Sequence, residues 1–134
     1  MLFRSERITK QGTAILEVIR VAGRPLLSQE ILDLSATKVP GIGIATVYRN
    51  IKSLLDQGEI QEVQLPGENP RYEISEAEHE HHHHFQCYEC DRVFDVHACP
   101  GDFSHLAPKG FKVRDHELTL YGSCFECQSK LPNK

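Results

Sequence analysis

The chain has 134 residues, of which 40% are hydrophobic and 25% are charged. This is the composition of a soluble globular protein with one ordinary domain or two small ones. The sequence contains no apolar run near the roughly 20 residues that span a bilayer and no signal-peptide core, so we expect a cytoplasmic protein. Thiols stay reduced in that compartment, where paired cysteines bind metal more often than they form disulfides.

The formal net charge of −4 is unevenly distributed along the chain. Residues 1–74 hold nine Lys or Arg and nine Asp or Glu, whereas residues 75–134 hold six and ten. All eight histidines and all five cysteines also lie after residue 74. We therefore expect two domains, residues 1–74 and 81–134. The segment 75–80, which is acidic and lacks large apolar side chains, is the expected hinge.

Three stretches of the first domain repeat apolar residues at helical spacing: Thr9–Ala22, a segment from Ser28 onward, and Ala45–Gln57. Thr9 and Ser28 are candidate N-caps, and Gly58 follows the third stretch where a left-handed C′ residue is usual. Two short alternating runs, 59–65 and 71–74, then flank a Pro-Gly-Glu-Asn-Pro turn and predict a hairpin. Three short helices followed by a hairpin indicate a winged helix-turn-helix.

The outer face of the predicted third helix carries hydroxyl, aromatic and cationic side chains: Thr46, Tyr48, Arg49 and Lys52. A helix that enters the major groove of DNA presents such a face, although an ordinary solvated helix does so too. The hairpin that follows favours the DNA-binding interpretation.

Short strands are predicted in the second domain around Phe85 and over Arg92–Val96, with a helical turn near Phe103–Ala107. The cleanest alternation, over Phe111–Tyr121, predicts its longest strand. About 55 residues bury too little surface for comfortable independence, so we expect metal and dimerisation to stabilise a small mixed sheet. The fold class is thus α+β: an N-terminal winged helix followed by a small α/β dimerisation domain.

Residues 79–90 concentrate five of the eight histidines and two of the five cysteines. Imidazole and thiolate are preferred ligands of transition metals, and a tag remnant would sit at a terminus. Cys87 and Cys90, together with Cys124 and Cys127, form two Cys-x-x-Cys pairs. They predict one closed, structural zinc site, since a redox dithiol needs a single pair in a βαβ setting.

The histidine run can supply two sites. In an extended segment, His82 and His84 point to one face, and His81 and His83 point to the other. The candidate partners are Glu73, Asp95, Asp102 and His116. Three further residues are spare ligands: His97, Cys99 and His105. Sites of imidazole and carboxylate bind metal more reversibly than four-thiolate sites, which suits a sensor. The alternative is one functional site with exposed spare histidines.

Four segments and one cysteine carry a family resemblance: Ile-Ala-Thr-Val-Tyr-Arg-Asn-Ile (44–51), Gly-Glu-Ile (58–60), His-His-His-His-Phe-Gln-Cys-Tyr-Glu-Cys (81–90), His-Glu-Leu-Thr-Leu-Tyr-Gly-Ser-Cys (116–124) and Cys127. Over nearly its full length the chain resembles the ferric uptake regulator family. The resemblance implies a homodimeric, metal-activated repressor of metal-homeostasis or metal-linked stress genes. A dimer with two recognition helices calls for double-stranded operator DNA that is palindromic and A·T-rich.

The resemblance also implies three metal sites. The structural zinc falls on Cys87, Cys90, Cys124 and Cys127. A hinge sensor site falls on Glu73, His82, His84 and Asp95. A second site falls on His81, His83, Asp102 and His116. The implied cofactors are structural Zn²⁺ and a regulatory Zn²⁺, Fe²⁺ or Mn²⁺.

The chain departs from the family pattern in three places. Many members have a sensor histidine just before the second helix, where this chain has Pro25-Leu26-Leu27. This difference argues against peroxide sensing. Asp is common in the family at His83, and Glu is common at the two acidic ligands, Asp95 and Asp102. The set of donor atoms is thus shifted from oxygen toward nitrogen. Cys99 and His97 are alternative ligands for the sensor site.

We expect no enzymatic activity. A metallohydrolase would need an open metal position and a general base in a pocket, and no motif supplies them. A metal-storage or chaperone protein would have no use for the polar face of the third helix. Metal-dependent DNA binding distinguishes the three classes.

Overall fold

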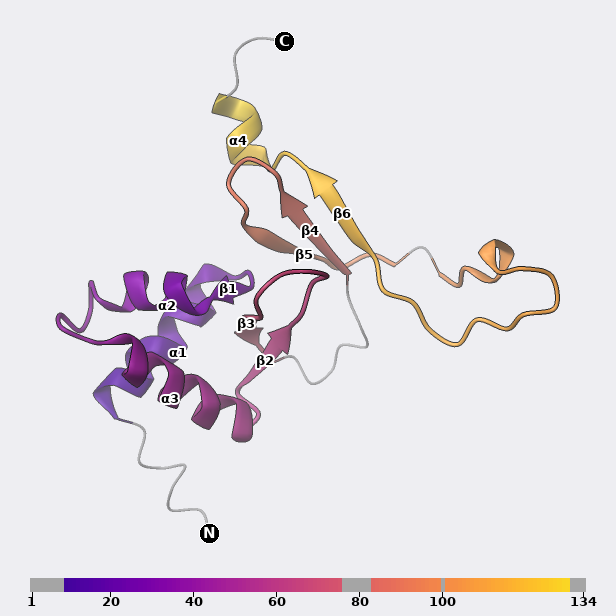
Figure 1. Cartoon of the computed structure of the whole chain (residues 1–134). Helices are drawn as coiled ribbons and strands as arrows, with labels where there is room; N and C mark the ends of the chain where they lie inside the picture. The colour runs from indigo at the N-terminus through magenta and orange to yellow at the C-terminus, as the bar shows by residue number, and fades with distance from the viewer. Residues whose placement is uncertain (1–8, 76–82, 100, 131–134) are drawn as a thin grey trace. The chain divides into compact units, whose positions relative to one another are not determined.

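A computed structural model describes residues 9–75, 83–99 and 101–130 of the chain (Figure 1). These residues divide between two compact units, one within residues 1–78 and the other within residues 79–134. Across the described ranges, no helix combines the length and the apolar character that crossing a membrane requires. Each unit has its own sheet, so each is treated separately below.

The first unit contains helices and a small sheet, with bounds α1 Lys10–Ala22, β1 Leu26–Leu27, α2 Ser28–Ser35, α3 Ile44–Asp56, β2 Ile60–Val63 and β3 Arg71–Ile74. Its strands are antiparallel in the order β1-β3-β2. Helices α2 and α3, followed by the β2–β3 hairpin, form the winged helix-turn-helix that the sequence predicts.

The ends of α1 and α3 follow from local chemistry. The Thr9 hydroxyl accepts a hydrogen bond from the Gly12 backbone N–H at 3.0 Å, which satisfies one of the free donors of the first turn. Gly23 ends α1 with a φ of +65°, and Gly58 follows α3 with a φ of +78°. Glycine adopts this left-handed conformation without the steric cost of a Cβ, so both helices end where the sequence indicates.

Helix α2 begins differently from the prediction. Ser28 is its first residue and not its N-cap; Leu27 holds that position, and its N–H donates to the Glu30 carboxylate at 3.0 Å. The two residues before the helix form strand β1, in which Leu26 pairs with Tyr72 of β3. This strand was not predicted, because a two-residue strand has no periodicity of its own.

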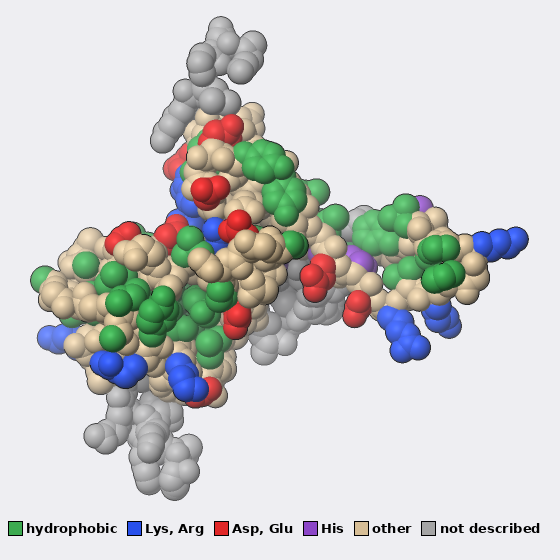
Figure 2. Space-filling model, in the orientation of Figure 1, with side chains coloured by type: hydrophobic (Ala, Val, Ile, Leu, Met, Phe, Trp, Pro, Cys, Tyr) green, Lys and Arg blue, Asp and Glu red, His purple; other side chains and the backbone are tan. Residues whose placement is uncertain are grey.

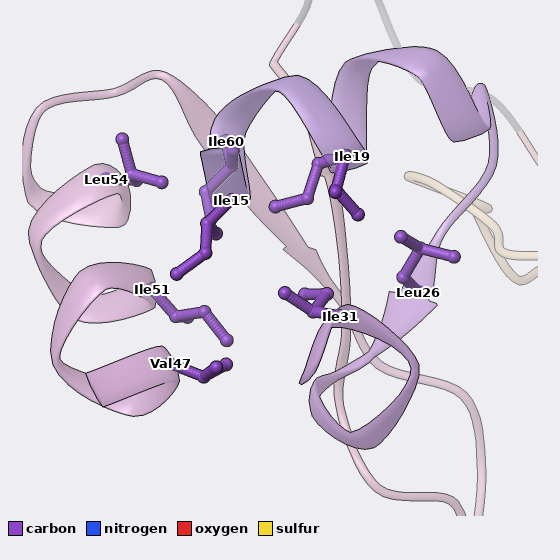
Figure 3. Packing of buried hydrophobic residues seen from close by; sticks show 9 residues of the cluster. Ile15, Ile19, Leu26, Ile31, Val47, Ile51, Leu54 and Ile60 are labelled. Atoms are coloured by element: carbon purple, nitrogen blue, oxygen red, sulfur yellow. The ribbon is translucent and has the colours of Figure 1, made fainter. Parts of the chain in front are cut away.

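One apolar core joins the helices and strands of the first unit (Figure 3), and Tyr72 and Ile74 of β3 pack against it. Its buried side chains are Ile15, Val18, Ile19, Leu26, Ile31, Val47, Ile51, Leu54 and Ile60. Each buried aliphatic side chain of this kind contributes roughly 1.5–3 kcal/mol relative to an exposed one. Three of the nine belong to α3, so its inner face is fixed against the core and its opposite face is turned to solvent.

The second unit is built on a three-stranded sheet, with elements β4 His83–Cys87, β5 Val93–Val96, η2 Ser104–Leu106, β6 Thr119–Gly122 and α4 Phe125–Lys130. The strand order is β5-β4-β6, with β5 antiparallel and β6 parallel to β4. The mixed sheet and the helical turn near Phe103–Ala107 agree with the sequence prediction.

The predicted long strand over Phe111–Tyr121 is wrong for most of its length. Only Thr119–Gly122 is a strand, and residues 111–118 belong to no strand. Alternating hydrophobicity becomes a strand only where a neighbour supplies hydrogen bonds, and pairing with β4 begins at Thr119. Phe111 is accordingly 71% exposed.

Candidate metal centres and nucleic-acid interface

The four paired cysteines meet at one end of the second sheet. Cys87 is the last residue of β4, and Cys90 lies in the turn that follows. Because β6 runs parallel to β4 with Gly122 opposite Cys87, the chain leaves β6 beside that turn. Cys124 then precedes α4, and Cys127 lies in its first turn.

The geometry of this group, called here the cysteine site, fits a zinc ion. The four sulfur atoms lie within 4.8 Å of one another. The Cys90 and Cys124 sulfurs are 3.9 Å apart, close to the about 3.8 Å expected for two sulfurs bound to a tetrahedral zinc. The backbone N–H groups of both residues donate to the Cys87 sulfur, at 3.5 and 3.3 Å.

Arg92 adds a cation to the cysteine site. Its Nε donates to the Cys90 sulfur at 3.1 Å, and its Nη2 donates to the Glu126 carboxylate at 2.6 Å. Burial opposes ionisation of the Cys90 thiol, but the hydrogen bonds from Arg92 have the larger effect. The pKa of Cys90 is therefore lowered to about 6. A zinc with four thiolates carries a net charge of about −2, which the guanidinium partly neutralises. Sequence analysis missed this role, although Arg92 stands only two residues after Cys90.

His84 and Asp95 form a second pair of potential ligands. They are opposite one another in the β4–β5 register, with His84 Nε2 and Asp95 Oδ1 3.4 Å apart and both side chains largely buried. His82, the neighbouring predicted ligand, lies outside the described residues. Glu73 belongs to β3 of the first unit, where its buried carboxylate accepts a hydrogen bond from the Gln61 amide at 2.8 Å.

His83 points to the opposite face of β4, as strand alternation requires. Its side chain is buried, and its ring centroid lies 5.0 Å from that of His116. The Cys99 sulfur is 3.3 Å from His116 Nε2, and one ligand atom from each of the three residues falls within 4.8 Å of the others. We call these three residues the Cys99 cluster.

The other residues proposed for the second site are placed differently. The Asp102 carboxylate accepts the Ser104 backbone N–H at 2.9 Å, which lowers the pKa of Asp102. Within the described part of the chain, Asp102 does not group with His83 and His116, and Cys99 does. His81 lies outside the described residues, and the spare histidines His97 and His105 join no such group there.

The predicted DNA-contacting residues lie along α3. Tyr48, Arg49 and Lys52 are exposed at successive turns, whereas Thr46 is half-buried and its hydroxyl accepts a hydrogen bond from Arg49 at 3.2 Å. The Tyr48 hydroxyl also lies 3.5 Å from that of Ser28 at the start of α2. Figure 2 shows Lys and Arg side chains along the lower edge of the visible face of the first unit.

Replacing a cysteine should remove the zinc and disrupt the second unit. We expect Cys124→Ser to bind about one zinc fewer per chain and to unfold or become monomeric, because the binding energy of a structural metal is folding energy. Elemental analysis and sedimentation after chelator treatment measure both effects. The control, Cys99→Ser, should retain the zinc, and an unchanged zinc content in Cys124→Ser would refute the assignment.

Arg92 should slow the release of zinc. We expect Arg92→Ala to bind zinc with the same stoichiometry but to lose it faster to a chromophoric chelator, because the Cys90 thiolate loses the side-chain hydrogen bond from Arg92 that lowers its pKa. The loss should be on the order of 10-fold faster. Arg114→Ala, which removes an exposed arginine far along the chain, is the matched control. Equal release rates in the two variants would show that Arg92 has no such role.

Comparison with known proteins identifies the family. A sequence model of the Ferric uptake regulator family matches residues 4–121. The chain is 32% identical over 128 residues to the peroxide operon regulator of Bacillus subtilis (strain 168), with 92% of this chain and 86% of that protein covered. The fold is similar to that of a zinc-bound manganese uptake regulator (26% identity, TM-score 0.75, covering 91% of this chain and 93% of the other). It is also similar to that of a zinc uptake regulator complexed with zinc and DNA (25% identity, TM-score 0.57, covering 92% and 84%). The chain belongs to the ferric uptake regulator family.

Proposed function

We propose that the protein is a metal-responsive transcriptional repressor that binds double-stranded operator DNA as a homodimer. The observation that carries this proposal is the exposed Tyr48-Arg49 and Lys52 face of α3 in a winged helix, on a chain that also holds clustered metal ligands. The relatives named above are regulators, and one of them is complexed with zinc and DNA. We therefore propose regulation and not catalysis.

The DNA contact follows from the size and chemistry of α3. The helix has 13 residues and is about 20 Å long, which suits insertion into a major groove. The first 74 residues are electrically neutral, so attraction to DNA must come from cations placed on one surface. Arg49 and Lys52 contact phosphates in this proposal, and the Tyr48 ring packs on thymine methyl groups.

Dimerisation would cover an apolar surface of the second unit. The side chains of Tyr88, Leu120, Tyr121 and Phe125 are 70%, 43%, 45% and 86% exposed, and the two tyrosine rings stack at 5.6 Å. Strand β6 is at an edge of its sheet, where unpaired backbone groups favour association. A two-fold dimer built on this surface presents two α3 helices, which matches a palindromic, A·T-rich operator.

Metal would act as the switch by joining the units. In this proposal the hinge sensor ligands are Glu73 on the wing, His84 and Asp95 on the second sheet, and His82. Two of them are carboxylates, and the segment 75–80 adds three more. A divalent cation removes their repulsion and limits the separation of the units, so DNA binding has less ordering cost. Such a coupling is typically about 1–3 kcal/mol, or roughly 5–150-fold in affinity.

Two further sites complete the proposal. The cysteine site holds a structural Zn²⁺, and the second site, drawn from His81, His83, Asp102 and His116, is the alternative location of the sensor. The regulatory metal is Zn²⁺, Fe²⁺ or Mn²⁺. Metal-titrated operator binding with each ion at buffered free concentration decides among them. A storage or chaperone protein would bind the metals without binding operator DNA.

Tyr48 should read bases and not merely attract DNA. We expect Tyr48→Ala to reduce the preference for operator over random DNA by roughly 1–3 kcal/mol, with little change in binding to random DNA. Tyr48→Phe keeps the ring and should retain most of the preference. Competition binding at fixed salt measures the ratio, and an equal loss on both DNAs would show that Tyr48 does not read bases.

His84 should couple metal to DNA. We expect His84→Ala to lose metal-dependent operator binding while keeping the zinc of the cysteine site and the dimer, because only the hinge site loses a ligand. Fluorescence anisotropy across a metal titration measures the response, with His105→Ala as the control for removing an exposed histidine. A normal response in His84→Ala would transfer the sensor to the second site.

A further inference from the structure

Cys99 is the one cysteine of the five in the sequence that stands outside the two Cys-x-x-Cys pairs. It lies in the chain that follows β5, and its side chain is exposed. Its sulfur is 3.3 Å from His116 Nε2, and one ligand atom from each of Cys99, His83 and His116 lies within 4.8 Å of the others. A thiol beside two imidazoles is a donor set for a thiophilic metal.

The distances in the Cys99 cluster fit a tetrahedral metal. Zinc bonds of about 2.3 Å to sulfur and 2.0–2.1 Å to nitrogen place a sulfur and a nitrogen ligand about 3.5 Å apart. The observed 3.3 Å between the Cys99 sulfur and His116 Nε2 is close to this value. Neighbouring residues pack against both imidazole rings and limit their movement. His83 is only 2% exposed within β4, and the Phe103 ring meets the His116 ring edge-on at 4.6 Å.

Asp102, the carboxylate that the family resemblance implies for this site, has another role in the structure. Its Oδ1 accepts the Ser104 backbone N–H at 2.9 Å, at the start of the η2 turn. Cys99 lies beside His116 and joins the ligand group to which Asp102 does not belong. The donor beside His116 is thus a soft sulfur and not a hard oxygen.

We propose that Cys99 is a thiolate ligand of the second site, which becomes a Cys-His₂ centre selective for Zn²⁺ over Fe²⁺ and Mn²⁺. Thiolate ligands favour zinc, whereas carboxylates suit manganese. This inference rests on the proposed function only for the existence of a second metal site. The hinge site, built on carboxylates and imidazoles, would keep a different preference, so one chain would distinguish two metals.

Cobalt spectroscopy tests the ligand directly. Protein that keeps zinc in the cysteine site is stripped of weakly bound metal and titrated with Co²⁺, while elemental analysis checks that the zinc stays. A cobalt–thiolate bond gives a near-ultraviolet charge-transfer band, which we expect in the unmodified protein and in Asp102→Asn. We expect the band to be absent in Cys99→Ser, with zinc content and dimer unchanged. A full band in Cys99→Ser, or a band lost only in Asp102→Asn, would overturn the proposal.

Metal competition tests the selectivity. We expect Cys99→Ser to weaken Zn²⁺ binding at the second site by more than the roughly 10–100-fold that loss of an outer-shell partner costs. Cys99→Asp restores a hard donor and should raise the affinity for Mn²⁺ relative to Zn²⁺. An unchanged Zn²⁺/Mn²⁺ preference in Cys99→Asp would contradict the inference. Neither experiment uses DNA, so failure of operator binding would overturn the proposed function without affecting this assignment.

Discussion

The parallel pairing of β4 with β6 is the constraint on which the second unit depends. Four residue pairs, from His84 with Thr119 to Cys87 with Gly122, join two segments that are more than thirty residues apart. Such a pairing is entropically costly to close, and a sheet of this size supplies little burial to offset it. A zinc held by cysteines from both segments would fix the closure at one end. The metal and the strand pairing would therefore stabilise each other.

The same strand separates two groups of potential metal ligands. His83 and His84 are adjacent in β4, so the pleat sends them to opposite faces, one toward Cys99 and His116 and the other toward Asp95. A slip of one residue in the β4 register would exchange the two faces and assemble neither group. Correct register in β4 is thus as important for the metal groups as the identity of the ligands.

Features with local causes could be predicted from the sequence. The caps of α1 and α3, the wing hairpin and the two Cys-x-x-Cys turns each depend on residues a few positions apart, so spacing alone reveals them. Strand β1 and the true start of α2 depend on pairing with β3, which no local pattern reports. The prediction of a strand over Phe111–Tyr121 was wrong for the opposite reason. The local pattern alternates, but among the described residues no strand pairs with residues 111–118.

The metal ligands divide in the same way. The cysteine site was predictable because each half of it is a short motif. The grouping of Cys99 with His116 depends on the path of the chain between β5 and β6, which sequence spacing does not determine. Arg92 was missed for a related reason. A basic residue near a cysteine pair acquires such a role only when the fold brings Cys124 and Glu126, at the start of α4, to its guanidinium.

Leu26 has a consequence for how a signal could be read. It is fully buried in the core with Ile19 and Ile31, within the stretch Pro25-Leu26-Leu27, whose side chains offer no metal ligand before α2. Apolar packing therefore fixes the start of α2. In a regulator built this way, a metal signal would have to enter through ligands other than residues 25–27, such as Glu73 of the wing or the ligands of the second unit.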